Sequence, residues 1–219
     1  LTSSDAELTI LGRPGMPIGR GLAAADLNND SYGDIVIGSA SRVDVIYGSP
    51  SLGGIIDLSS TAADVTILGL GIGGVLTTGD VNGDGVVDLL MGAPFGDASS
   101  RGAVYVVYGA SSGALAAEIT LPGDAGALFL GIDPGDTAGS SVGVADVDGD
   151  GRDDILIGAP YGDGPDGTRR DAGEAYVIWG TGSAVQSRSL GAAPVVFFGP
   201  LSYLGRGLNT GDLNFDGTD

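Results

Sequence analysis

Short apolar segments separated by turn-forming residues set the pattern of this chain. They are rich in β-branched and aromatic residues and bounded by Gly, Asp, Ser or Pro, and no window shows a helical period over ten residues. The predicted strands lie at 8–12, 35–40, 43–48, 65–69, 89–94, 103–109, 128–131, 155–160, 175–180 and 195–199, with weaker ones at 55–60 and 118–123. This pattern predicts an all-β fold.

A recurring acidic loop interrupts the apolar pattern. Its four copies begin at Asp26, Asp80, Asp146 and Asp212, which are 54, 66 and 66 residues apart. An apolar segment and a glycine-rich approach precede the loop, and two further apolar segments follow each of the first three copies. We therefore divide one repeat domain, 1–219, into repeats 6–62, 63–124 and 125–192 and a partial repeat 193–219.

Each repeat holds about four short strands, which is the content of one propeller blade. The sequence thus predicts a β-propeller-type fold of four-stranded blades, with three full repeats and the start of a fourth. A β-sandwich is the second choice, but sandwiches do not repeat a loop motif once per four strands. A calcium-binding β-helix repeats far more often than once in ~60 residues and is set aside.

The loop places oxygen-bearing side chains at positions 1, 3, 5 and 9, with glycine usually at position 6. Loops with this spacing bind hard cations through these side-chain oxygens, and the backbone carbonyl of position 7 is a further ligand. The predicted metal ligands are Asp26, Asn28, Asp30, Tyr32 and Asp34; Asp80, Asn82, Asp84, Val86 and Asp88; Asp146, Asp148, Asp150, Arg152 and Asp154; and Asp212, Asn214, Asp216 and Thr218. The first loop departs from the pattern, because Ser31 stands at position 6 and Gly33 at position 8.

Composition narrows the choice of ion and partner. The chain has 28 acidic and 9 basic residues, a net charge of −19, and neither His nor Cys. Zinc and copper prefer nitrogen or sulfur ligands, and magnesium prefers a small octahedral shell, so Ca²⁺ is the predicted cofactor. The negative charge disfavours nucleic acid, and no apolar run is long enough for membrane insertion in this segment.

The loop and its flanks resemble the FG-GAP repeat of integrin α-chain β-propellers and their bacterial relatives. The GAP triplets are 92–94 and 158–160, with a looser copy at 38–40. The FG half is reduced to Ile18-Gly19, Leu70-Gly71 and Leu204-Gly205. The resemblance implies a propeller of usually seven blades, with calcium held in a hairpin loop of the blade, and a role in extracellular adhesion and ligand binding.

Three and a half repeats make about half of such a ring. We expect a fragment of a larger propeller, because the chain has no initiator methionine or signal peptide and stops inside its fourth loop. The alternatives are copies that complete one another through open blade edges, or an open fibre-like array.

Two functions follow from these observations. The first is a calcium-binding module for adhesion or ligand recognition, located outside the cell or on its surface, whose protein or glycan ligand is unknown. The second is a self-assembling subunit of an extracellular fibre or coat. A non-catalytic or lectin-like part of a larger secreted enzyme is the third choice. We expect no catalysis in this segment, because it lacks His, Cys and Lys. A catalytic pair of carboxylates that includes Asp163 or Asp166 is conceivable, but we expect segment 161–171 to be a solvent-exposed turn instead.

Overall fold

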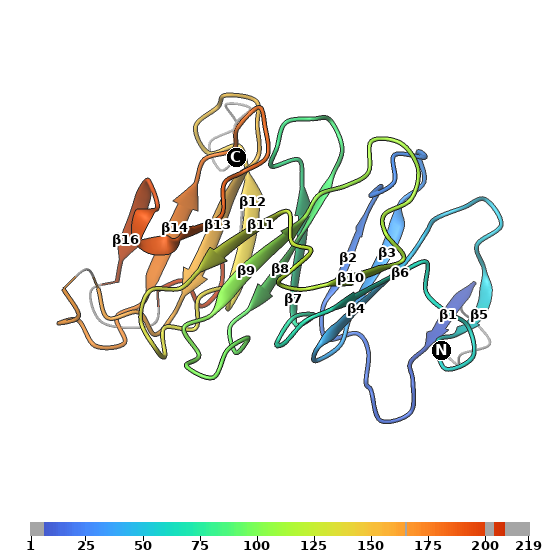
Figure 1. The fold of residues 1–219 in the computed structure, drawn as a ribbon, viewed down its shortest axis with the longest axis horizontal. Helices are drawn as coiled ribbons and strands as arrows, with labels where there is room; N and C mark the ends of the chain where they lie inside the picture. The colour runs from blue at the N-terminus through green and yellow to red at the C-terminus, as the bar shows by residue number, and fades with distance from the viewer. Residues whose placement is uncertain (1–6, 165, 200–203, 209–219) are drawn as a thin grey trace.

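The computed structural model of the chain describes residues 7–164, 166–199 and 204–208. Within these ranges every element is a β-strand except one 3-10 turn, η2 (Leu190–Ala192), so the all-β prediction is confirmed (Figure 1). The described part contains no helix that is both long and apolar enough to cross a membrane. Of the predicted partial repeat 193–219, residues 200–203 and 209–219 lie outside the described residues, and these include the whole fourth loop.

Three sheets share one design, in which four antiparallel strands follow one another from the inner to the outer edge. Blade 1 contains β2 (Leu22–Ala25), β3 (Asp34–Gly38), β4 (Arg42–Ile46) and β6 (Val65–Leu68); blade 2 contains β7 (Val75–Gly79), β8 (Asp88–Ala93), β9 (Ala103–Val107) and β11 (Ala127–Leu130); blade 3 contains β12 (Ser141–Ala145), β13 (Asp154–Ala159), β14 (Glu174–Ile178) and β16 (Val195–Phe198). The predicted four-stranded blades are therefore present.

The outer strand of each blade comes from the repeat that follows it in sequence. The strand β6 belongs to repeat 63–124 but pairs antiparallel with β4 of blade 1, where Val65 faces Val45. A short parallel strand adds to this outer edge in two blades, and a further parallel pair precedes blade 1. These parallel strands are β10 (Glu118–Thr120) beside β6, β15 (Arg188–Ser189) beside β11, and β5 (Gly54–Asp57) beside β1 (Leu8–Leu11). Each blade is thereby tied to the next repeat.

The blades fan out from their inner strands. The strand β7 contacts both β2 and β12, so the three inner strands lie side by side while the outer strands diverge (Figure 1). This arrangement is that of neighbouring propeller blades.

The core lies between the faces of neighbouring blades. On β8, Leu89 and Met91 pack with residues of blade 1, whereas Leu90 points to the other face and packs with residues of blade 3. All three side chains are fully buried. Full burial of each such side chain contributes about 1.5–3 kcal/mol, so the packing between blades is a main source of stability.

The aromatic side chains of the strands serve this packing. Tyr105 and Tyr176 are buried, and Tyr47, Tyr108 and Trp179 are half-buried. The hydroxyl of Tyr47 accepts a hydrogen bond from the Leu115 N–H, and that of Tyr108 donates to the Val185 carbonyl. This agrees with a packing role for these residues rather than an exposed platform for stacking sugars.

Candidate metal-binding loops

The three complete acidic loops occupy equivalent places in the three blades. Each joins the inner strand to the second strand: loop 1 (26–34) follows β2, loop 2 (80–88) follows β7 and loop 3 (146–154) follows β12. Position 9 is in each case the first residue of the second strand. The motif therefore recurs once per blade at one kind of hairpin, as the resemblance implied. The inner strands β2, β7 and β12 were not predicted, because the segments before the loops were interpreted only as a glycine-rich approach.

Position 1 folds the loop around its own carboxylate. In loop 3, the Oδ1 of Asp146 accepts the N–H of Asp150 at 3.0 Å and its Oδ2 accepts the N–H of Gly151 at 2.8 Å. Asp26 and Asp80 accept the same two N–H groups of their own loops. Three independent stretches of sequence thus reach one backbone geometry.

Position 9 ties the loop to the rest of the blade. In loop 2, the Oδ2 of Asp88 accepts the Val81 N–H at 3.1 Å and its Oδ1 accepts the Gly109 N–H at 3.0 Å. Asp34 and Asp154 make the same two bonds, and the second donor is always the glycine just after the third strand: Gly48, Gly109 or Gly180. The loop spacing gave no indication of these glycines, although each one ends a predicted apolar segment at the same place in its repeat.

The position 9 carboxylates are buried in negative surroundings. Asp34 and Asp88 are 0% exposed and Asp154 is 1% exposed. Burial raises the pKa of Asp88 to about 7, and although the Gly109 and Val81 N–H groups oppose this, the charges of Asp84 and Asp80 add to it. Burial raises the pKa of Asp34 and Asp154 in the same way. A negative charge at position 9 is therefore costly unless a cation lies beside it.

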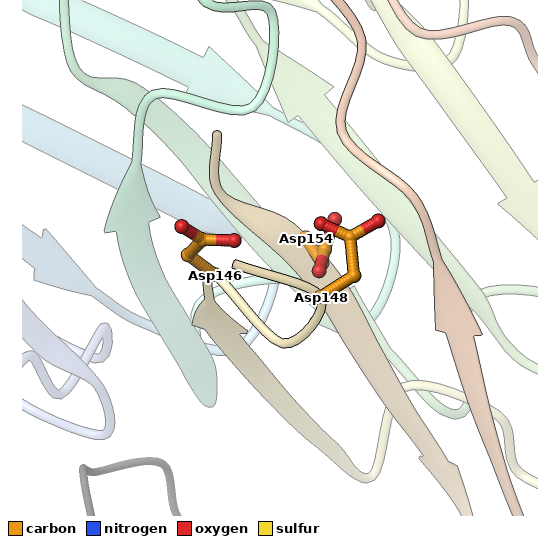
Figure 2. Close-up of side chains that lie close together, drawn as sticks. All are labelled: Asp146, Asp148 and Asp154. Atoms are coloured by element: carbon orange, nitrogen blue, oxygen red, sulfur yellow. The ribbon is translucent and has the colours of Figure 1, made fainter. Parts of the chain in front are cut away.

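Loop 3 brings three carboxylates together. Asp146, Asp148 and Asp154 each offer an oxygen that lies within 4.8 Å of the others (Figure 2). The carboxylate of Asp150 accepts the Arg152 N–H at 3.0 Å and forms an ion pair with the Arg152 guanidinium at 2.6 Å. Positions 1, 3 and 9 thus converge, whereas the predicted contributions of positions 5 and 7 to a metal shell stay predictions.

In loops 1 and 2, position 3 is an asparagine. The Oδ1 of Asn82 accepts the Asp84 N–H at 2.9 Å, and its Nδ2 donates to the Asp84 carboxylate at 3.0 Å. Asn28 bonds to Asp30 in the same way in loop 1. These loops therefore keep the geometry of loop 3 with one carboxylate fewer. The ligands predicted in the fourth loop, Asp212, Asn214, Asp216 and Thr218, lie outside the described residues.

The backbone adopts a left-handed conformation at positions 4 and 6 of the three described loops. The φ angles are 70° and 84° at Gly83 and Gly85, and nearly the same at Gly149 and Gly151. Loop 1 has 56° at Asn29 and 72° at Ser31. The serine at position 6 therefore leaves the turn unchanged, but it holds a strained φ that glycine adopts freely.

Replacing Ser31 with glycine should raise the free energy of unfolding by about 0.5–1 kcal/mol, because relief of the left-handed strain exceeds the added chain entropy. Urea denaturation measures this, with Ser31→Ala as a control that keeps the strain. A loss of stability in the glycine variant would contradict the described turn.

Comparison with known proteins identifies the repeats. A family model described as the FG-GAP repeat matches residues 73–107 and 138–178, which span loops 2 and 3 with the strands around them. This chain is an FG-GAP repeat protein. The resemblance seen in the GAP triplets and the loop motif is thereby confirmed.

Relatives of this FG-GAP protein fall into two groups. Phosphatidylinositol-glycan-specific phospholipase D of Mus musculus is 30% identical over 185 residues, which cover 74% of this chain and 20% of that protein. Integrin alpha pat-2 of Caenorhabditis elegans is 31% identical over 167 residues (66% and 13%), and integrin alpha-PS5 of Drosophila melanogaster is 33% identical over 161 residues (65% and 15%). The chain spans about a fifth or less of the length of these relatives.

A second group of buried acids in this FG-GAP protein was not foreseen. Asp136 and Glu174 are 2% and 3% exposed, and Glu174 accepts hydrogen bonds from the Tyr176 hydroxyl and the Gly164 N–H. Burial raises the pKa of Asp136 to about 6. The negative charge of Glu174 contributes to this rise in pKa, whereas the hydrogen bond from the Asp133 N–H opposes it. Nothing in the local sequence distinguishes these acids from the exposed ones around them.

The loop after β13 contains the acids considered for a catalytic pair. Asp163 accepts the Asp171 N–H at 2.8 Å, and Asp166 accepts the Thr168 N–H and hydroxyl. Both acids thus bond within the loop that follows β13. Asp166 lies in an exposed turn, as expected, whereas Asp163 is half-buried and its bond spans eight residues.

Proposed function

We propose that this chain is a calcium-binding FG-GAP propeller module that serves adhesion or ligand recognition outside the cell or at its surface. The observation that carries the proposal is the threefold recurrence of one hydrogen-bonded loop geometry around a buried position 9 carboxylate, together with the convergence of three carboxylates in loop 3. A bound Ca²⁺ would supply the positive charge that this arrangement lacks and would hold the hairpins rigid.

The donor set suits calcium. Every side-chain donor at positions 1, 3, 5 and 9 of the three loops is a carboxylate or amide oxygen, and Ca²⁺ takes six to eight oxygen ligands in flexible geometry. Although both oxygens of a position 9 carboxylate accept N–H groups, each oxygen keeps a second lone pair for a cation. Positions 1, 3 and 9 would hold the ion, with position 5 and the carbonyl of position 7 completing the shell.

The relatives support the location and the role. Integrin α chains and phosphatidylinositol-glycan-specific phospholipase D are extracellular or surface proteins. Extracellular calcium modules bind Ca²⁺ with Kd of about 10⁻⁴–10⁻³ M, so loops of this kind bind calcium outside the cell and stay empty at cytosolic calcium levels.

The adhesive role comes from the likeness to integrin α chains. The match covers only about a fifth of each mammalian phospholipase relative. A non-catalytic role within a larger enzyme is therefore the competing proposal.

Calcium at about 1 mM should raise the free energy of unfolding by roughly 1–4 kcal/mol, since each of three loops adds about 0.4–1.4 kcal/mol by mass action. Thermal unfolding with calcium and with a chelator measures this. The control changes position 5 in the three complete loops (Asp30→Asn, Asp84→Asn and Asp150→Asn) and should remove most of the gain. An unfolding temperature that does not respond to calcium would contradict the proposal.

A second candidate, self-assembly, is favoured by one surface of blade 3. An apolar hollow on this blade is lined by Leu156, Tyr176, Val177, Phe197, Phe198 and Leu204, and the Phe197 side chain is 55% exposed. The equivalent faces of blades 1 and 2 are each covered by the next blade. Light scattering with and without a chelator distinguishes the candidates, because assembly requires oligomers that grow with concentration, whereas a single module stays monomeric.

A further inference from the structure

Asp153 stands at position 8 of loop 3, but its carboxylate contacts loop 2. Its Oδ2 accepts the backbone N–H of Asp80 at 2.8 Å. Asp80 is position 1 of loop 2, whose carboxylate organises that loop and is a predicted metal ligand. A side chain of one loop therefore fixes the first ligand of another, across the boundary between two blades.

The surrounding chain is shaped for this close approach. A Cβ atom on Gly79 would lie 2.7 Å from the Asp153 Oδ2 and 2.2 Å from the Val144 Cγ1, so a side chain before Asp80 would have to displace both of them. A Cβ on Gly83 would lie 3.6 Å from the Cδ of Arg152, which places position 4 of loop 2 beside position 7 of loop 3. Loops 2 and 3 thus meet at two points.

Asp153 lies between two predicted ligands of its own loop, the carbonyl of Arg152 and the carboxylate of Asp154. An ion that holds both neighbours also fixes the backbone of Asp153 and the direction of its side chain. In loops 1 and 2, position 8 is Gly33 and Val87, which have no side-chain acceptor. Among the three described loops, this contact therefore runs only from loop 3 to loop 2.

We propose that Asp153 couples the two sites, so that calcium in loop 3 strengthens calcium binding in loop 2. The inference rests on the proposed function, because it requires that both loops bind calcium. With loop 3 filled, Asp153 presents its oxygen to the Asp80 N–H and loop 2 is ordered before its ion arrives. By linkage, calcium in loop 2 strengthens loop 3 by the same factor, and we expect about 5- to 10-fold, at the lower end of typical coupling between sites.

Site-resolved titration tests the coupling. The backbone amides of Gly85 and Gly151 report loops 2 and 3 separately in an NMR titration of the chain with CaCl₂. Disabling loop 3 with Asp146→Asn and Asp148→Asn should weaken loop 2 by about 5- to 10-fold. Asp153→Ala should weaken loop 2 to the same extent, and combining it with the disabled loop 3 should cause no further loss.

Controls separate the hydrogen bond from charge and from folding. Asp153→Asn keeps an acceptor oxygen and should retain most of the coupling, while Asp166→Ala removes an equal charge elsewhere in the same repeat and should leave loop 2 unchanged. Disabling loop 2 with Asp80→Asn and Asp84→Asn should weaken loop 3 by the same factor with Asp153 intact.

Three results have different meanings. If loops 2 and 3 of the unaltered chain bind calcium, but the intact loop of each disabled-loop variant and loop 2 of Asp153→Ala keep their affinities within twofold, the coupling is wrong and the proposed function stands. If Asp153→Asn behaves as Asp153→Ala does, the acceptor role is wrong. If neither amide responds to millimolar calcium in the unaltered chain, the proposed function itself is contradicted.

Discussion

Replacing Gly38 with alanine should lower the free energy of unfolding by about 3 kcal/mol or more. Gly38 ends β3, and a Cβ there would lie 1.8 Å from the carbonyl oxygen of Gly73, in the turn that leads into blade 2. The obstacle is backbone, which cannot rotate away as a side chain can. Overpacking of a buried site costs about 1–3 kcal/mol, and more where the neighbour cannot move.

The same contact recurs between the other repeats. A Cβ on Gly92 would lie 2.1 Å from the Gly139 carbonyl oxygen, and one on Gly158 would lie 2.0 Å from that of Gly205. The glycine that begins each GAP-type triplet therefore allows the backbones of two neighbouring repeats to come into direct contact, which gives a physical reason for the triplet.

Gly74→Ala is the matched control for Gly38→Ala. Gly74 has no atom within 4 Å of an added Cβ and no left-handed φ, so alanine there should change stability by no more than about 0.5–1 kcal/mol, in the stabilising direction. Urea denaturation of both variants makes the comparison. Equal stability of Gly38→Ala and the unaltered chain would show that the blades do not approach as described.

Replacing Asp44 with alanine should lower the free energy of unfolding by about 3 kcal/mol, near the lower end of the cost of breaking a buried ion pair. Asp44 on β4 is 2% exposed and accepts hydrogen bonds from Arg42 and Arg13, each at 2.8 Å. The substitution leaves Arg13 and Arg42 without their partner, although only about one-fifth of each arginine side chain is exposed to water. Asp97→Ala is the control, since its pair with Arg101 is exposed and should contribute under about 1 kcal/mol.

The contribution of Asp44 should also depend on pH. Burial alone would raise the pKa of Asp44, but the hydrogen bonds and charges of Arg42 and Arg13 outweigh burial and hold it below 3.8. Because the pKa is lower in the folded state, the stabilisation is present above the ordinary value and is lost as pH falls through the folded value. The gap in stability between the unaltered chain and Asp44→Ala should therefore narrow below about pH 4, and a gap that widens there would contradict the ion pair.

Much of the fold followed from local sequence. Segments such as 89–94 and 103–109 are continuous apolar runs, and the structure buries both of their faces between blades, so their strand character was visible. The recurrence of the acidic loop once per repeat gave the repeat organisation, whereas its place in a hairpin came only from the resemblance to FG-GAP repeats, because the inner strands such as β7 are too weakly apolar to be predicted. What the sequence did not reveal is pairing between repeats, because a segment such as 65–68 looks the same whether it joins its own repeat or the preceding blade.

The candidate site could be predicted only in part, because some of its contacts also come from distant segments of the chain. The spacing of Asp146, Asp148 and Asp154 showed that their oxygens could converge, but their contacts with distant residues could not be read from spacing. Gly180 reaches Asp154, and Asp153 reaches Asp80, only because the sheets bring together residues that lie 26 and 73 positions apart. The need for a left-handed residue at position 4 was hidden as well, because asparagine and glycine both satisfy it.

The count of calcium ions bound by the folded chain tests the central claim most directly. Isothermal titration calorimetry should show at least three ions per chain at millimolar calcium, one for each complete loop, and one fewer after Asp80→Asn and Asp84→Asn in loop 2. Absence of calcium uptake, or the full count in a variant whose three loops have all lost these aspartates, would contradict it.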